Sequence, residues 1–202
     1  MSREASEAGA GVDAKLAGAL DRAGQALAAE LRRAAHAAGL SATQARVLVR
    51  LSAEPEGERR VGALAAAFDL RQPTVSDAVA ALDRKGLVRK RAARADARAV
   101  LLELTARGRR VAASLGDWDA RVRAALGRLP VAGRATVLSL LLELLGDLHR
   151  EGVIAEARMC TTCRYLERSG GTPAYCRLLR IPLEPADLRV HCPDHEPDRA
   201  AA

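Results

Sequence analysis

Aromatic side chains are scarce in this chain of 202 residues, which has one phenylalanine, one tryptophan and two tyrosines. Alanine, leucine and arginine are abundant instead, and all three favour the α-helix. This composition excludes a core built mainly from aromatic rings. We expect a core of aliphatic side chains packed between helices.

Long apolar runs are also missing. No stretch reaches the roughly 18 to 20 apolar residues of a membrane span. The first residues, MSREASEAGAGVDA, contain three acids and lack the apolar segment of a secretory signal. The sequence therefore predicts a soluble, cytoplasmic protein with no membrane partner.

Cysteine is absent from the first 159 residues, and all four cysteines follow within the C-terminal segment. A reducing compartment opposes structural disulfides and favours metal-binding or redox-active thiols. For this segment we therefore place metal binding ahead of disulfide formation.

Positive charge is concentrated in one part of the chain. The net charge is +7. The segment from Arg84 to Arg110 contains ten basic residues and only two acids, Asp96 and Glu103, so its net charge is +8. A basic patch of this size indicates a polyanionic partner.

Apolar spacing and capping signals predict the order of elements. An apolar stripe at helical spacing predicts a first helix that ends near Gly39, and Ser41 with Gln44 forms a capping box for a second. A short third helix and a fourth with Pro73 in its first turn form a helix-turn-helix, and Gly86 ends the fourth. Val75, Val79 and Leu82 are the expected buried residues of the fourth helix.

A charged hairpin and two long helices are expected next. Residues 87–91 and 99–104 have the composition of paired strands, and Thr105 can cap a fifth helix that runs to Leu129. After Pro130, a sixth helix has an apolar surface that is broad for a helix with one neighbour. We expect the first, fifth and sixth helices to form a homodimer; closure of a bundle within one chain is the alternative.

Two motifs give this arrangement a family resemblance. The segments LDRKGLVRK and DARAVLLELTARG resemble the core of the MarR family of bacterial transcriptional regulators, and the resemblance covers about Val12 to Arg158. It implies a mainly α-helical winged helix-turn-helix with a small β-hairpin wing, flanked by long dimerisation helices. It also implies a double-stranded DNA partner and a small-molecule effector, whose pocket Trp118 could line, although a lone tryptophan is more often part of the core.

The solvent face of the fourth helix holds the predicted DNA contacts, because a helix of this kind enters the major groove. Gln72 suits adenine, and Arg84 suits guanine or phosphate. The wing signature implies that Arg98 contacts the minor groove or backbone and that Asp96 orients the tip. For Asp77 we favour stabilisation of the helix dipole as a first-turn acid over a contact with cytosine. The predicted DNA-binding set is Gln72, Thr74, Ser76, Asp77, Arg84, Arg89, Arg94, Asp96 and Arg98.

The cysteines Cys160, Cys163, Cys176 and Cys192 have the spacing C-x2-C-x12-C-x15-C. Four thiolates can hold structural zinc or an iron–sulfur cluster. Zinc is the first choice, the cluster second, and metal-free redox thiols third. His191 or His195 could replace one ligand. A segment this short needs such a staple, because its apolar content is too small for a core of its own.

The sequence therefore predicts a flexible tail over residues 1–11, a MarR-like domain over 12–158, a Cys-rich metal-binding module over 159–197 and a second tail over 198–202. Within the domain, we expect the winged helix-turn-helix at about 41–105 and dimerisation helices at about 12–39 and 105–158. We expect a transcriptional repressor that binds an inverted repeat, and we do not expect an enzyme. The four cysteines form a site for structural zinc or for an iron–sulfur or redox sensor. The alternative is a metal-stabilised interaction or architectural module that binds nucleic acid without sequence preference.

Overall fold

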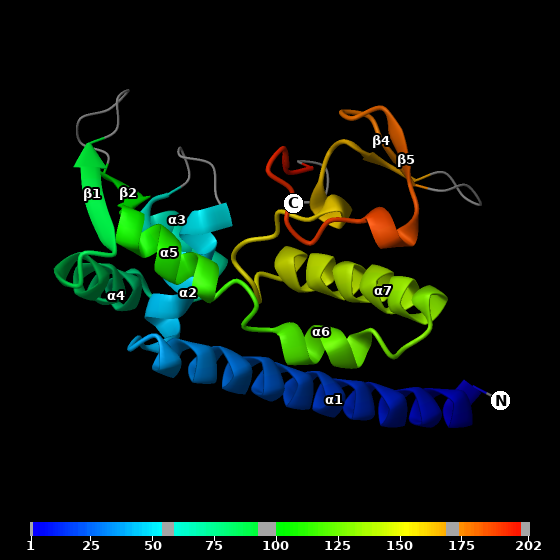
Figure 1. Cartoon of the computed structure of the whole chain (residues 1–202). Helices are drawn as coiled ribbons and strands as arrows, with labels where there is room; N and C mark the ends of the chain where they lie inside the picture. Colours follow the sequence, from blue (N-terminus) through cyan, green and yellow to red (C-terminus); the bar gives the residue numbers. More distant parts are fainter. Residues whose placement is uncertain (1, 54–58, 93–99, 169–173, 199–202) are drawn as a thin grey trace.

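The computed structural model describes residues 2–53, 59–92, 100–168 and 174–198, without the side chains of residues 2–10. Helix α1 runs along one side of the molecule and connects the two ends of the structure (Figure 1). One end is a lobe of short helices with a β-hairpin. The other consists of α6 and α7 with the cysteine-containing segment over α7 (Figure 1).

Helix α1 spans Ser2–Ala37 and so includes residues 2–11, for which the sequence predicted a flexible tail. Residues 2–11 contain three alanines and two glutamates, which favour a helix, together with two glycines, which do not. The helix ends before Gly39, whose φ of +67° is the left-handed conformation that glycine adopts without strain. Only the C-terminal half of α1 is packed into the lobe, through Leu31 and Ala35.

The lobe contains α2 (Ala42–Ala53), α3 (Val61–Ala67) and α4 (Gln72–Arg84). The predicted capping box is confirmed: the Gln44 N–H donates to Ser41 Oγ and the Ser41 N–H donates to Gln44 Oε1, both at 3.2 Å. The predicted inner face of α4 is also confirmed, because Val75, Val79 and Leu82 are fully buried. These residues belong to an aliphatic core that α2, α3, α4 and the hairpin share.

The predicted hairpin consists of β1 (Val88–Ala92) and β2 (Val100–Leu104), which pair antiparallel. The Leu102 N–H also donates to the carbonyl of Arg59 at 2.7 Å, which fastens the hairpin to the segment before α3. Thr105 caps the next helix as predicted, with its Oγ1 accepting from the Gly108 N–H at 2.9 Å.

The expected fifth helix is interrupted. It forms α5 (Ala106–Ser114) and α6 (Ala120–Leu126), with a turn between them. Gly116 is a poor helix residue, and Arg123 holds the turn by pairing with Asp117 at 2.6 Å and Asp119 at 2.9 Å. Apolar periodicity continues across this turn, which is why the sequence pattern predicted one helix.

Helix α7 spans Val131–Arg150, so the helical part ends earlier than the predicted 158. Residues 151–158 form a non-helical linker to the cysteine module. The module contains short 3-10 turns, η2 (Cys160–Thr162) and η3 (Pro185–Asp187), and a sheet of β3 (Leu166–Glu167), β4 (Ala174–Cys176) and β5 (Ile181–Leu183) in the order β3-β4-β5. It packs on α7 in a second core around Leu142.

The expected second tail is wrong at its first residue. The Asp198 N–H donates to the carbonyl of Thr162 at 3.1 Å, so this residue is part of the module. Residues 199–202 lie outside the described ranges.

Within those ranges, no single helix is both long and apolar enough to span a membrane. The pair α6 and α7, bent by 117° at the break between them, meets these two requirements only when taken together.

Candidate functional site

The outer face of α4 presents the predicted DNA-contacting side chains to solvent. Gln72, Thr74, Ser76, Asp77 and Arg84 are all exposed, while the opposite face of the helix is fixed in the core of the lobe. Helix α4 lies at the outer end of the lobe, next to the hairpin (Figure 1). A rigid helix of 13 residues with a polar outer face therefore stands free to enter a groove.

The role favoured for Asp77 is wrong. Helix α4 begins at Gln72, and its first turn contains no acid. Asp77 lies in the second turn, where the helix dipole acts weakly because its influence is confined to the terminal turn.

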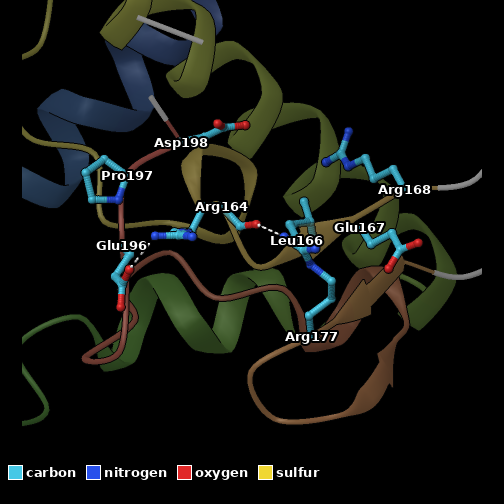
Figure 2. Close-up of a pocket in the computed structure, with 8 residues that line it drawn as sticks. All are labelled: Arg164, Leu166, Glu167, Arg168, Arg177, Glu196, Pro197 and Asp198. Atoms are coloured by element: carbon cyan, nitrogen blue, oxygen red, sulfur yellow. Dashed lines mark hydrogen bonds and ion pairs between the residues drawn. The ribbon is translucent and has the colours of Figure 1, made fainter. Parts of the chain in front are cut away.

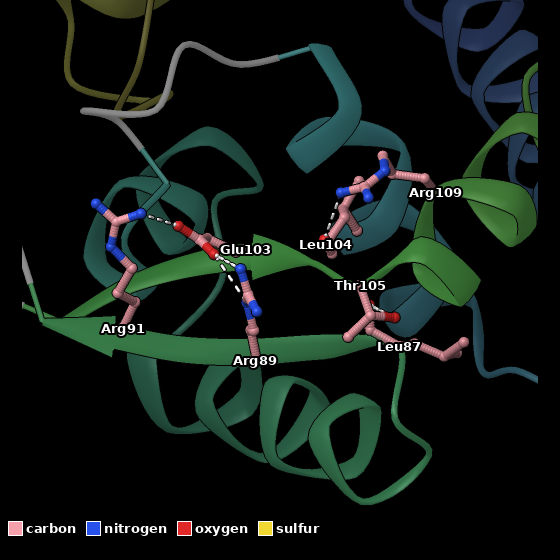
Figure 3. Close-up of polar contacts among 7 residues, drawn as sticks. All are labelled: Leu87, Arg89, Arg91, Glu103, Leu104, Thr105 and Arg109. Atoms are coloured by element: carbon pink, nitrogen blue, oxygen red, sulfur yellow. Dashed lines mark hydrogen bonds and ion pairs between the residues drawn. The ribbon is translucent and has the colours of Figure 1, made fainter.

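The arginines of the described part of the hairpin are held by one carboxylate. Glu103 on β2 lies opposite Arg89 on β1, and its two oxygens pair with Arg89 and Arg91, each at 2.7 Å (Figure 3). The hydrogen bond from Arg89 is the main reason that the pKa of Glu103 lies below its usual value, and the charges of both arginines add to it. Arg94, Asp96 and Arg98 lie outside the described residues.

Several other basic residues of this segment bond to the backbone of the lobe. Lys85 Nζ donates to the carbonyl of Gly39 at 2.6 Å, and Arg109 Nη1 donates to that of Leu104 at 2.9 Å (Figure 3). The concentration of charge in the sequence therefore serves both the surface potential and the packing of the hairpin against its neighbours.

A cavity of about 340 Å³ opens between α1, α2 and the turn before α6. Its lining residues are apolar apart from Arg46, whose guanidinium carbon lies 5.6 Å from the ring centroid of Phe68. Trp118 packs against the core of the lobe, as considered from the sequence, and also lines this cavity.

The structure brings the four cysteines together around one small cavity of about 20 Å³. Cys160 and Cys163 lie on the η2 turn, where the Cys163 N–H donates to the Cys160 carbonyl at 3.1 Å. Cys176 ends β4, and Cys192 is held by its N–H bond to the Arg158 carbonyl at 2.8 Å. The rest of the wall is mainly apolar and is formed by Tyr165, Leu166, Leu178, Leu179, Leu183 and Asp194.

All four cysteines are free thiols. Burial raises the pKa of Cys160, and the three neighbouring thiols add to this, while the Arg189 N–H, 3.2 Å from its Sγ, opposes it. In the described part of the chain, no group of three or more His, Cys, Asp and Glu side chains is arranged to hold a single metal ion. His195 Nε2 lies 3.0 Å from Thr162 Oγ1, and neither His195 nor His191 is among the described residues that line the cavity.

The chain end closes the cysteine module. Arg164 Nη1 pairs with Glu196 at 3.2 Å (Figure 2). The next residue, Pro197, forms an isolated antiparallel β-bridge with Cys163. The hydroxyl of Tyr165 also donates to Glu196, at 2.6 Å, and this bond is the main cause of the raised pKa of Tyr165. The first cysteine pair therefore lies between α7 and the last described residues of the chain.

The linker between α7 and the cysteines contacts the winged lobe. Glu156 pairs with Arg50 of α2 at 3.1 Å, and both side chains are about three-quarters buried, with exposures of 24% and 23%. The Ala155 N–H donates to Asp69 Oδ1 at 2.8 Å, in the turn between α3 and α4. Neither contact has a signal in the sequence pattern, because the partners lie 106 and 86 residues apart.

Comparison with known proteins agrees with this geometry. The family model described as "MarR family" matches residues 38–99, which contain α2, α3, α4 and β1. Over these residues the chain is similar to the MarR family. No curated protein sequence matches the chain.

Solved structures extend the MarR likeness beyond the winged helix. A MarR family transcriptional regulator from Silicibacter pomeroyi is 27% identical, with a TM-score of 0.55, over 64% of this chain and 86% of its own. CouR from Rhodococcus jostii RHA1, bound to p-coumaroyl-CoA, is 28% identical, with a TM-score of 0.52, over 64% of this chain and 87% of its own. The S. aureus MepR–DNA complex, 18% identical with a TM-score of 0.58 over 65% of this chain and 97% of its own, shows the same fold. Each of these three matches leaves more than a third of this chain uncovered.

Proposed function

We propose that this protein is a cytoplasmic transcriptional regulator that binds an inverted-repeat operator as a homodimer and represses transcription by occupying it. The observation that carries the proposal is the free polar face of α4 beside a hairpin rich in arginine. The MarR-type winged helix and the DNA complex of MepR, a protein of the same fold, support it.

The apolar surface outside the lobe supports the dimer. Several large apolar side chains of α1, α6, α7 and the loop between α6 and α7 are 40% to 68% exposed: Val12, Leu16, Leu20, Leu126, Leu129, Val131, Val137, Leu140 and Leu144. An apolar surface of this extent on one end of a molecule marks an interaction site. A two-fold partner covers it and spaces two α4 helices for a two-fold operator.

Part of the surface that the sequence assigned to the partner has another role. Leu142 is fully buried under the cysteine module, and Leu138 and Leu145 pack beside it. The proposed interface therefore uses the other face of α7, which carries Leu140 and Leu144.

The dimer is tested with Leu16→Glu and Leu140→Glu. Each places a charge on the proposed interface, so we expect a monomer in analytical ultracentrifugation and weak binding to an inverted repeat. Val190→Glu is the matched control, because Val190 is 57% exposed but lies in the cysteine module. A parent protein that is itself monomeric, or interface variants that remain dimeric, would remove the dimer from the proposal.

Sequence-specific binding is tested by comparing an inverted repeat from the protein's own promoter with a scrambled duplex across a salt series. Neutralisation of six to ten phosphates predicts a loss of about 10³ to 10⁵ in affinity between 50 and 200 mM salt. Gln72→Ala should cost about 1–3 kcal/mol on the specific site and little on scrambled DNA. Gln25→Ala, an exposed change on α1, is the control. Equal affinity for both duplexes would favour the architectural alternative.

A small aromatic acid is the proposed effector, because the cavity beside Trp118 is lined by apolar residues and by one basic residue, Arg46. CouR, whose ligand p-coumaroyl-CoA carries an aromatic acyl group as a thioester, supports the aromatic part of this choice. Trp118 is the single tryptophan, so its fluorescence reports directly on the cavity. Titration with benzoate as the probe should change this signal in the parent and much less in Arg46→Ala, and an unchanged signal in both would contradict the proposal.

A further inference from the structure

Four free thiols share one small cavity in the cysteine module, outside the winged lobe and on the far side of α7 from α6 (Figure 1). The volume of about 20 Å³ is room for about one water molecule, so little free space separates the side chains that line it. We propose that two of these thiols, Cys160 and Cys192, are a reversible redox pair that a peroxide oxidises to a disulfide.

Hydrogen bonds of the backbone bring the segments of Cys160 and Cys192 together. The Cys160 N–H donates to the carbonyl of Arg189 at 3.0 Å, and the Cys192 N–H donates to that of Arg158 at 2.8 Å. These two bonds lay residues 158–160 beside residues 189–192. Two cysteines that are distant in sequence therefore lie on neighbouring pieces of backbone and line the same cavity.

Arg189 contacts the sulfur atoms of both cysteines. Its N–H donates to Cys160 Sγ at 3.2 Å, and its guanidinium lies 3.8 Å from Cys192 Sγ. Burial is the main cause of the raised pKa of Cys160, and among the three neighbouring thiols Cys192 adds most to it. Both observations favour Cys192 over Cys163 and Cys176 as the partner of Cys160.

The size of the cavity selects the chemistry. A disulfide inserts no atom between its two sulfurs, which approach to about 2.05 Å when the side chains rotate. The water-sized space suits this reaction, because the oxidant that enters must be small and the product that leaves is water. Leucine and tyrosine side chains form most of the remaining wall and keep bulky thiol reagents out.

Exposure sets the order of the two steps. Cys160 is buried, whereas Cys192 is partly exposed, so hydrogen peroxide reaches Cys192 first. Its sulfur attacks one peroxide oxygen, the O–O bond breaks, and the other oxygen leaves as water with the thiol proton. Cys192 is then a sulfenic acid.

The second step forms the disulfide. The sulfur of Cys160 attacks that of Cys192, the S–S bond forms, and the S–O bond breaks. The hydroxyl leaves as water with the proton of Cys160. Two thiols and one hydrogen peroxide thus give one disulfide and two waters, with two electrons passed from sulfur to oxygen. A dithiol reductant reverses the reaction by thiol–disulfide exchange.

The disulfide joins two ends of a weakly packed module. The core of the module contains only a few buried side chains, and a segment of about 40 residues gains much of its stability from such a link. Oxidation therefore converts a module held by hydrogen bonds into one held covalently.

The test is a disulfide map of the full chain. The protein is reduced with dithiothreitol, freed of reductant with a chelator present, treated with equimolar hydrogen peroxide, blocked with iodoacetamide and digested with trypsin. Trypsin separates the cysteines into peptides 159–164, 169–177 and 190–199. We expect two of the four free thiols to be lost, with peptide 159–164 joined to 190–199, and both changes to be reversed by dithiothreitol.

Three results overturn the proposal: an unchanged number of free thiols, oxidation to sulfinic acid without a disulfide, and a disulfide within peptide 159–164 or to peptide 169–177. A disulfide-linked dimer on a non-reducing gel overturns it as well, because the proposed bond lies within one chain.

Single serine variants place the bond. Cys160→Ser and Cys192→Ser should lose the link between the two peptides, whereas Cys163→Ser and Cys176→Ser, the matched controls, should keep it. A link that survives in Cys160→Ser contradicts the assignment, because Cys163 is then the partner. If a variant does not fold, fragmentation of the joined peptides from the parent still identifies the bonded cysteines. None of these measurements uses DNA, so the result is independent of the proposed regulatory function.

Discussion

At the scale of single residues, Gly108 shows why the hairpin and α5 can meet. A Cβ at this position would lie 1.9 Å from the carbonyl oxygen of Leu87, the residue before β1, so only glycine fits there. We therefore expect Gly108→Ala to displace α5 and to lower the free energy of unfolding by about 2–4 kcal/mol. Chemical denaturation followed by far-ultraviolet circular dichroism measures this change.

Gly133→Ala is the matched control for Gly108→Ala. A Cβ there meets nothing within 4 Å, and the residue lies inside α7. This substitution should raise stability by about 0.5–1 kcal/mol, because alanine is the better helix former. A Gly108→Ala protein as stable as the parent would show that the backbone at Leu87 yields easily.

Glu103 restrains two arginines of the hairpin, Arg89 and Arg91. We expect Glu103→Gln to free Arg89 and Arg91 for phosphate, raise affinity for duplex DNA several fold at 50 mM salt, and steepen the salt dependence by about one to two units. Fluorescence anisotropy measures both quantities. Glu30→Gln, which breaks an ion pair on α1, should change neither. Weaker DNA binding by Glu103→Gln would mean that Glu103 positions the arginines instead.

The same carboxylate predicts a pH dependence of stability. The pKa of Glu103 is lower in the folded protein than its usual 4.5. Its ion pairs therefore stabilise the fold above about pH 4.5, and this contribution is lost as the pH falls through the lower, folded value. Relative to Glu103→Gln, the parent should lose stability only below about pH 4.5, as thermal unfolding at a series of pH values can show.

At the scale of elements, α7 is the support of the cysteine module. Leu142 is fully buried between them, and Thr161 Oγ1 donates to the Leu142 carbonyl at 2.9 Å. Leu142→Ala should cost about 2–5 kcal/mol of stability and increase amide exchange in β4. Val190→Ala, at an exposed site of the module, should stay within about 0.5 kcal/mol. Unchanged exchange in Leu142→Ala would show that the module is stable without α7.

Elements also mark how far local sequence signals reach. The caps at Ser41 and Thr105 are contacts between residues three apart, and the buried face of α4 is marked by apolar residues three and four apart. The sequence therefore predicted all three correctly. The break before α6 was missed because apolar spacing continues through it, while the ion pairs of Arg123 stabilise the turn. Helix α1 was started too late because its first residues lack an apolar stripe although they favour helix.

At the scale of the whole molecule, the linker gives the cysteine module a route to the DNA-binding lobe. It holds α2 through Glu156 and the turn before α4 through the Ala155 N–H. If the proposed operator binding is right, loosening of the linker should weaken it by at least about fivefold.

Glu156→Gln tests this route. We expect it to weaken operator binding, because the link to Arg50 is weakened and the linker then holds α2 less firmly. Glu151→Gln, an exposed change in the same linker, should bind the operator like the parent. The measurement is operator affinity by fluorescence anisotropy. An unchanged affinity in Glu156→Gln would show that the linker does not influence the lobe.

The sequence by itself determined the order of elements, the inner face of α4 and the winged-helix likeness, because helical periodicity, caps and turn residues are local. Only the tertiary structure decided that Glu103 holds Arg89 and Arg91, that residues 151–158 contact the lobe, and that four dispersed cysteines enclose a space. These contacts join residues that are far apart in the chain. The cysteine spacing left zinc and a cluster both open, since it fixes the number of ligands but not the room between them.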